Sequence, residues 1–224
     1  MCMTLNKTTC HARTIESAQD GRTPDRLLDM YRRKLRSEEI NALPMVCYEG
    51  EVRLVRSEAE LDEALAFLSR EELLGFDTET RPSFRKGKLN QPSLIQLAAS
   101  DRIFLMQLAF VPFGGRIASL LSNEKILKVG VGIRDDMREL SKLYSFEGAG
   151  AVDLGDLARS LKLPTQGLRN MAANLMGWRI SKGSRCSNWS LPDLSPRQIA
   201  YAATDAWIGR ELYLKMHEVG LLPQ

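Results

Sequence analysis

From about residue 46 onwards, apolar and polar positions follow a regular order that predicts a folded core domain. Residues 51–56 (EVRLVR) alternate with the period of two that is typical of a strand. Ser57 and Glu60 then form a capping box, which opens a helix. The apolar positions of this helix recur at helical spacing: Leu61, Ala64, Leu65 and Leu68. The core domain is therefore predicted to span residues 46–224.

Three strands are predicted in close succession after this helix. They cover residues 73–79 (LLGFDTE), 92–99 (PSLIQLAA) and 101–108 (DRIFLMQL). A loop that contains Gly, Pro and Asn separates the first two strands, and a short turn around Ser100 and Asp101 separates the last two. Strands that follow one another this closely are typical of antiparallel pairing. We therefore expect an antiparallel meander.

The rest of the chain alternates helix and strand and then continues as helices alone. The pattern predicts a helix near residues 114–122, a strand over 125–132, a helix over 134–144 and a short strand at 151–154. This order is typical of an α/β fold in which α-helices flank a mixed β-sheet. At 224 residues the chain suffices for one such domain and an extension, and it is too short for two catalytic domains.

Residues 1–45 are predicted to form an N-terminal extension, made of a flexible tail followed by a helix. The helix is expected within residues 23–43, where apolar side chains recur at helical spacing: Leu27, Leu28, Tyr31 and Leu35. The basic cluster in residues 32–36 is interpreted as a solvated helix face rather than a phosphate-binding surface, because Glu38 and Glu39 follow it.

Composition narrows the class of protein. Hydrophobic residues make up 44% of the chain and charged residues 26%, and no run of eighteen apolar residues occurs, so we expect no membrane span. The first residues lack the apolar core of a secretory signal, and a cytoplasmic location is expected. The cysteines lack the spacing of a zinc site. The net charge of +3 permits a polyanionic partner without requiring one, and a monomer is the default expectation.

Asp77 and Glu79 are the first candidates for chemistry. One residue separates them within a predicted strand, so both carboxylates project to the same side. Paired acids at the end of a strand are often simply solvated. The apolar residues 73–76 precede this pair, however, and place it at the end of a strand that we expect to be buried. Two acids that face one way in such a place indicate a bound cation.

Tyr201 and Asp205 are predicted to share one face of a helix. Ser195 opens this helix, with Pro196 at its first position and Gln198 completing a capping box. Because Tyr201 and Asp205 are four residues apart, the phenol and the carboxylate point the same way. Taken singly, a core aromatic residue and a solvated acid would explain them equally well.

A fourth acid follows the strand predicted at residues 125–132. Asp136 lies where this strand leads through two glycines into a helix, and an anion near a helix N-terminus is stabilised. The neighbouring Asp135 is the alternative, with helix capping as its structural role.

Three segments resemble, in order, the motifs of the DEDD superfamily of 3′-to-5′ exonucleases. They are FDTET (residues 76–80), VGVGIRDDMREL (129–140) and YAATD (201–205), and the resemblance covers residues 51–216. Within the superfamily, KGSRCSNWS followed by SPRQIAYAATDAW is most similar to the exonuclease domain of the Werner syndrome helicase, with ribonuclease D next. The resemblance implies a ribonuclease H-like fold, with a mixed β-sheet flanked by α-helices.

The resemblance also implies a role for each candidate residue. Two divalent ions, Mg²⁺ or Mn²⁺, would be held by four acids: Asp77 as the bridging ligand, Glu79 and Asp205 on the ion that activates water, and Asp136 on the second ion. Tyr201 would orient the attacking water, which makes this the tyrosine (DEDDy) subclass. Such an enzyme hydrolyses phosphodiester bonds from the 3′ end of a nucleic acid and releases nucleoside 5′-monophosphates.

Two segments are expected to contact the substrate. Arg81 and Lys86 lie in the basic loop directly after the first motif, and solvated loop charges are the alternative reading. The second segment matches the substrate-side stretch of the superfamily and contains Lys182, Arg185, Asn188 and Trp189. Trp189 is interpreted as a packing residue rather than as a stacking platform for a base.

The substrate and some competing classes stay open at this stage. The similarity to the Werner-type domain favours DNA, and a ribonuclease D-like RNA exonuclease is the alternative. A catalytically silent nucleic-acid-binding module would share the fold. A metal-dependent phosphatase would use a similar acid cluster. The three ordered motifs, with all their acids intact, favour an active exonuclease.

Overall fold

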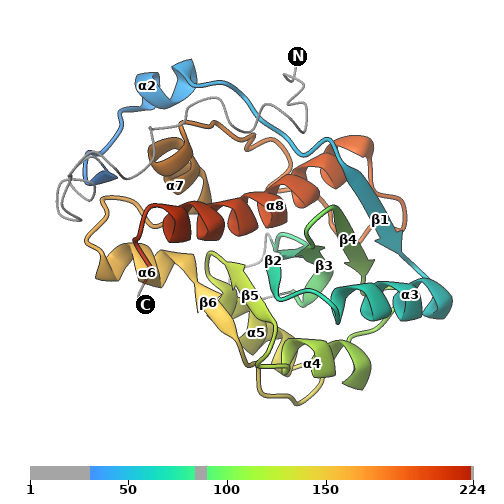
Figure 1. Cartoon of the computed structure of the whole chain (residues 1–224). Coiled ribbons are helices and arrows are strands. Elements are labelled where there is room, and N and C mark those ends of the chain that lie inside the picture. The colour runs from blue at the N-terminus through green and yellow to red at the C-terminus, as the bar shows by residue number, and fades with distance from the viewer. Residues whose placement is uncertain (1–30, 84–89, 223–224) are drawn as a thin grey trace.

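A mixed β-sheet forms the centre of the molecule in the computed structural model, which describes residues 31–83 and 90–222. The six described strands are arranged in the order β1-β4-β3-β2-β5-β6 (Figure 1). Their bounds are β1 (Glu51–Val55), β2 (Leu73–Thr80), β3 (Pro92–Ala98), β4 (Arg102–Gln107), β5 (Leu127–Gly130) and β6 (Ala151–Asp153). β3 is antiparallel to β2 and β4, and the β1–β4, β2–β5 and β5–β6 pairs are parallel. The predicted mixed sheet and antiparallel meander are thus confirmed.

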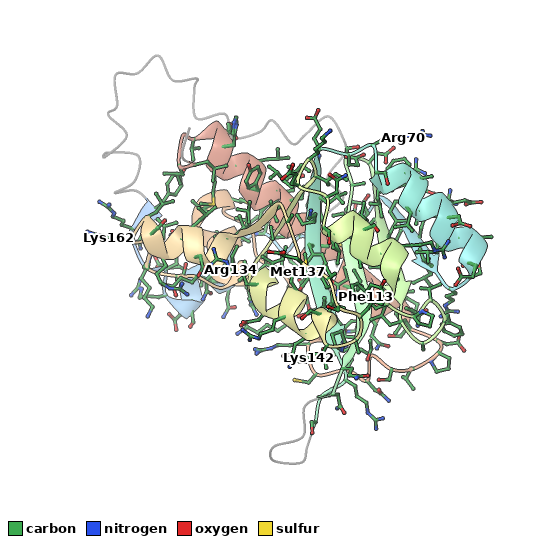
Figure 2. The ribbon with its side chains drawn as sticks, turned by 90° about the horizontal axis from the view of Figure 1, so that it is seen from below. Arg70, Phe113, Arg134, Met137, Lys142 and Lys162 are labelled. Carbon is green, nitrogen blue, oxygen red and sulfur yellow. The ribbon has the colours of Figure 1, made fainter. Side chains whose placement is uncertain are left out.

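Helices cover both faces of this sheet (Figure 1). One face packs against the long helix α8 (Pro196–Glu218). The other face packs against α3 (Glu58–Leu68), α4 (Gly115–Leu121) and α5 (Ile133–Ser141). Figure 2 looks from below onto α4 and α5, with Arg134, Met137 and Lys142 labelled along α5. Among the described helices, none is both long and apolar enough to cross a membrane.

Alternation along β2 sends its side chains to the two faces in turn. Leu74 and Phe76 belong to the apolar cluster under α3, α4 and α5. Gly75 faces α8, and a Cβ atom there would lie 2.1 Å from the backbone oxygen of Ala206. The missing side chain lets α8 approach the strand closely. The next residues that point towards α8 are Asp77 and Glu79, because the side-chain period of a strand is two.

A second apolar cluster surrounds the C-terminal half of α8. It contains residues of α6 (Leu154–Ser160), α7 (Leu168–Met171) and a short π-helix, η1 (Ala172–Met176). The chain that leads into β1 is joined to this region, since the amide of Val46 donates to the oxygen of Arg179 at 2.9 Å. The amide of Tyr48 donates to Oγ1 of Thr204 on α8 at 3.0 Å. The proposed division of the chain at residue 46 stays a prediction.

The prediction of one continuous helix in the N-terminal extension is wrong for the residues that the structure describes. Tyr31 is helical, residues 32–36 are not, and α2 (Ser37–Ala42) follows. Tyr31 is 5% exposed within the second apolar cluster, and the Asn174 side-chain amide donates to its backbone oxygen. Oε2 of Glu39 accepts from the backbone amide of Arg36 at 2.9 Å and from its Nε at 3.3 Å, at the start of α2. Packing and capping therefore outweigh local helix propensity, and the predicted tail lies outside the described residues.

Candidate active site

The candidate acids gather at one edge of the sheet. β2 and β5 are parallel neighbours, so their carboxyl ends meet at the same edge, where ligand sites of α/β sheets commonly lie. Asp77 and Glu79 lie at the end of β2, and α5 begins directly beyond β5. Glu79 is buried. Asp77 keeps some exposed surface as a residue, whereas its carboxyl group is surrounded by protein.

α8 brings the third acid and the tyrosine to this edge. As predicted, Ser195 caps the helix by accepting from the amide of Gln198, and Pro196 stands at its start. Asp205 is buried, Tyr201 lies one turn before it, and the Tyr201 hydroxyl donates a hydrogen bond to the Asp205 carboxylate. The shared helix face predicted from the spacing of four residues is thus present.

The fourth acid is Asp136, in the first turn of α5. The glycine before this helix, Gly132, has φ of 82°, a conformation that favours glycine. The hydroxyl of Thr78 on β2 donates to Oδ1 of Asp136 at 2.6 Å and ties α5 to the first motif. Asp135, the alternative, is exposed and forms an ion pair with Arg138 at 2.7 Å. The structure therefore brings Asp136 rather than Asp135 into the cluster.

The carboxylates of Asp205 and Asp136 perturb those of Asp77 and Glu79. Burial and the carboxylates of Asp205, Asp136 and Glu79 raise the pKa of Asp77 well above its ordinary value. Burial and the same neighbours, Asp205 and Asp136, raise the pKa of Glu79 to about 9. Burial raises the pKa of Asp205 to about 7, although the hydrogen bond from Tyr201 lowers it. Burial likewise raises the pKa of Asp136 to about 6, although the hydrogen bond from Thr78 lowers it. These acids form one site that needs protons or cations for its neutralisation.

The carboxylates are close enough to interact, but they do not close around one point. In the described part of the chain, no three His, Cys, Asp or Glu side chains are arranged to enclose a metal ion by themselves. Mg²⁺ commonly binds through one or two carboxylates, with waters and substrate phosphates completing its shell. The open arrangement therefore fits a site that is completed by water and substrate oxygen atoms.

The residues predicted to contact substrate have different positions. Arg185 is exposed. Its positive charge lowers the pKa of Glu79, so the guanidinium lies near enough to interact with this acid. Lys182 is also exposed in this segment. Oδ1 of Asn188 accepts from the amide of Ser190 at 3.2 Å and supports a local turn.

The remaining residues that were predicted to contact substrate are Trp189 and the basic residues of the loop after β2. Trp189 is 1% exposed, with its ring centroid 6.0 Å from that of Tyr201, which confirms packing over stacking on a base. Arg81 is exposed directly after β2. Lys86 lies outside the described residues, as do Arg85 and Lys88.

Sequence reasoning missed two features beside the acids. Thr78 lies inside the first motif but points to the opposite sheet face, and only its contact with Asp136 reveals a role. A cavity of about 120 Å³ opens beside Tyr201 and Asp205, and its wall includes Ser184 and Arg197. No local sequence signal brings these segments together, because the cavity forms between α8, the chain before β1 and the loop before α8.

The raised pKa of Glu79 predicts a pH-dependent stability in metal-free buffer. Below its ordinary pKa of 4.5, Glu79 is protonated in both the folded and the unfolded chain. Between 4.5 and about 9, only the unfolded chain ionises freely, so this group's contribution to stability is lost as pH rises. We expect Glu79→Gln to raise the free energy of unfolding by about 2 kcal/mol at pH 8 and by much less at pH 5.

Urea denaturation in EDTA at both pH values measures this effect. Glu72→Gln is the matched control, because Glu72 is an exposed acid just before the same strand. Equal shifts of Glu79→Gln at pH 5 and pH 8 would contradict the buried-charge explanation.

Comparison with known proteins relates this site to a family. The sequence model of the family described as "3'-5' exonuclease" matches residues 52–220. The chain is also similar to the "Bifunctional 3'-5' exonuclease/ATP-dependent helicase WRN" of Mus musculus, with 34% identity over 159 residues. That match covers 68% of this chain and 11% of the relative, so the chain spans about a tenth of the relative's length.

Two solved structures share the fold. The Aedes aegypti Nibbler EXO domain has a TM-score of 0.69 and 24% identity over 77% of this chain and 90% of that one. The Trypanosoma brucei RNase D complex with RNA U12 has a TM-score of 0.66 and 20% identity over 76% of this chain and 63% of that one. These likenesses confirm the ribonuclease H-like sheet. Because the family model spans most of the sequence, this chain belongs to the 3′-to-5′ exonuclease domain family of the DEDD superfamily.

Proposed function

We propose that this chain is a metal-dependent exonuclease that removes nucleotides one at a time from the 3′ end of DNA. The observation that carries the proposal is the cluster of four interacting carboxylates at one edge of the sheet. They come from three elements, namely Asp77 and Glu79 from β2, Asp136 from α5 and Asp205 from α8. Removal of 3′ nucleotides is the activity that the family description names.

The residues present fit divalent cations of the magnesium type. The four candidate ligands are carboxylates, and oxygen is the donor that Mg²⁺ and Mn²⁺ prefer. The raised pKa values of these acids are a further sign that the cluster lacks positive charge. Asp77, Glu79 and Asp205 would hold one ion, and Asp77 and Asp136 the other. When bound, a pair of such ions supplies a nucleophilic hydroxide and stabilises the leaving 3′ oxygen.

Tyr201 acts in this proposal as a donor that positions water. Burial, with the charges of Asp205 and Glu79, raises the pKa of Tyr201 above its ordinary value. A phenol with such a pKa stays protonated near neutral pH and is a poor base. Its hydroxyl can therefore donate a hydrogen bond but does not abstract a proton from the attacking water. This role corresponds to the tyrosine subclass of the superfamily.

Positive charge for the substrate backbone comes from the segment before α8. Arg185 lies near enough to Glu79 to affect its pKa, and Lys182 is exposed three residues earlier. We assign both to phosphates next to the scissile bond, since phosphate contacts position a nucleic acid independently of its sequence. Arg81 is exposed directly after β2 and is a further candidate for a phosphate contact.

DNA is the proposed substrate and RNA is the second candidate. The 34% identity to a protein named as an exonuclease and helicase favours DNA. RNA is the second candidate because the fold is similar to that of an RNase D that was crystallised with RNA. Neither stacking nor phosphate contacts distinguish the two, so the choice depends on contacts to the 2′-hydroxyl.

Two adjacent aspartates provide a matched test of the acid cluster. We expect Asp136→Asn to lower the exonuclease rate with Mn²⁺ by more than about 100-fold, because it removes a candidate ligand. Asp135→Asn should retain nearly the full rate, since Asp135 is exposed and paired with Arg138. The measurement is the release of nucleoside monophosphate from 3′-recessed duplex DNA. Equal losses in the two variants would contradict the assignment of Asp136.

Arg185 provides a test of the substrate side. We expect Arg185→Gln to raise KM for DNA about tenfold and to reduce the salt dependence of log kcat/KM by about one unit of slope, as for one lost phosphate contact. Arg70→Gln is the control, because Arg70 is an exposed cation at the end of α3, before β2 begins. An unchanged salt dependence of log kcat/KM in Arg185→Gln would contradict the assignment of Arg185 to a phosphate contact.

A further inference from the structure

Gln96 is an unusual polar residue in the middle of β3. It is 0% exposed, and neither its amide nitrogen nor its oxygen has a hydrogen-bond partner within the described structure. A buried amide without partners costs free energy, so each such group needs a physical reason. Gln107, a buried glutamine on the next strand, shows the usual case. Its amide donates to the backbone oxygens of Leu191 and Pro192, both at 3.2 Å.

The sheet register places Gln96 directly opposite Asp77. The two residues are partners in the antiparallel pairing of β2 and β3. Directly opposite residues project to the same face, with Cβ atoms about 4.5–5.5 Å apart. The other neighbours of Gln96 on this face are apolar: Leu94 and Ala98 along β3, and Leu105 opposite it on β4. Among these four neighbours, Asp77 alone is polar.

The chemistry of the two side chains is complementary. The Gln96 amide nitrogen has two hydrogens to donate, and an ionised carboxylate only accepts. Oδ1 of Asp77 already accepts from the amide of Thr78 at 2.9 Å, and Oδ2 remains available to a donor. The indole nitrogen of Trp189 also lacks a partner and lies in the same layer, but it only donates and cannot satisfy the Gln96 nitrogen.

We propose that Gln96 is a positioning residue for Asp77. Its amide turns towards β2 and donates a hydrogen bond to Oδ2 of Asp77, which fixes the orientation of this carboxylate for cation binding. The inference rests on the proposed function, in which Asp77 is the bridging ligand. A carboxylate held on both oxygens has less orientational freedom to lose when it binds a cation. This accounts for a buried amide whose neighbours along β3 and on β4 are apolar.

The test compares Gln96→Met with Gln107→Met, two equivalent changes on one sheet face. In EDTA, Gln96→Met should unfold at a urea concentration close to that of the wild type, because loss of the proposed hydrogen bond is offset by removal of a buried amide oxygen that has no partner in the described structure. Gln107→Met should unfold at a lower concentration. In Mn²⁺ titration calorimetry, Gln96→Met should bind about tenfold more weakly than the wild type, and Gln107→Met should bind within about twofold of it.

Exonuclease assays over a range of Mn²⁺ concentrations complete the test. Gln96→Met should recover much of its rate at high Mn²⁺, which a purely structural defect would not do. Gln96→Leu serves as a second variant in case Gln96→Met does not fold. Wild-type Mn²⁺ affinity in either folded variant overturns the role of Gln96 alone. A wild-type protein that binds no Mn²⁺ overturns the proposed function, and the role of Gln96 with it.

Discussion

Repulsion between buried carboxylates is the constraint on which the rest of this structure depends. Asp205 and Asp136 lie close enough to raise the pKa values of Asp77 and Glu79, in a place where burial already disfavours the charged forms of all four acids. Such a cluster is unfavourable for folding, so rigid elements must hold it in place. The sheet, α5 and α8 do so, and each of them has a local feature that secures its acid.

These local features connect fold to chemistry. Gly75 lets α8 lie close against β2, which brings Tyr201 and Asp205 over the strand that carries the first acids. The capping box at Ser195 fixes where α8 begins and hence which face its residues present. Thr78 points away from this layer but holds Asp136 by a hydrogen bond of 2.6 Å. The edge of the sheet that carries the candidate acids is therefore supported from both faces.

Local sequence patterns predicted much of this arrangement, and the reasons are physical. The period of two in β2 predicted that Asp77 and Glu79 share a side. The spacing of four predicted that Tyr201 and Asp205 share one helix face. Relations between distant segments were not predictable in this way. The hydrogen bond of Thr78, the register that places Gln96 opposite Asp77 and the cavity beside Tyr201 all depend on pairing across elements. Tyr31 shows the same limit, since tertiary packing interrupts a helix that propensity alone favours.

The most direct test measures the length of the labelled strand in a 5′-labelled, 3′-recessed DNA duplex. The duplex is incubated with the wild-type protein or with Tyr201→Phe, in Mg²⁺, Mn²⁺ or EDTA. Single-stranded DNA and RNA of the same sequence are run in parallel. The account predicts a ladder that shortens from the 3′ end with either metal, is absent in EDTA and is much slower for Tyr201→Phe. Full-length labelled strands on every substrate with both metals would contradict the enzyme assignment and leave a nucleic-acid-binding module on the same fold.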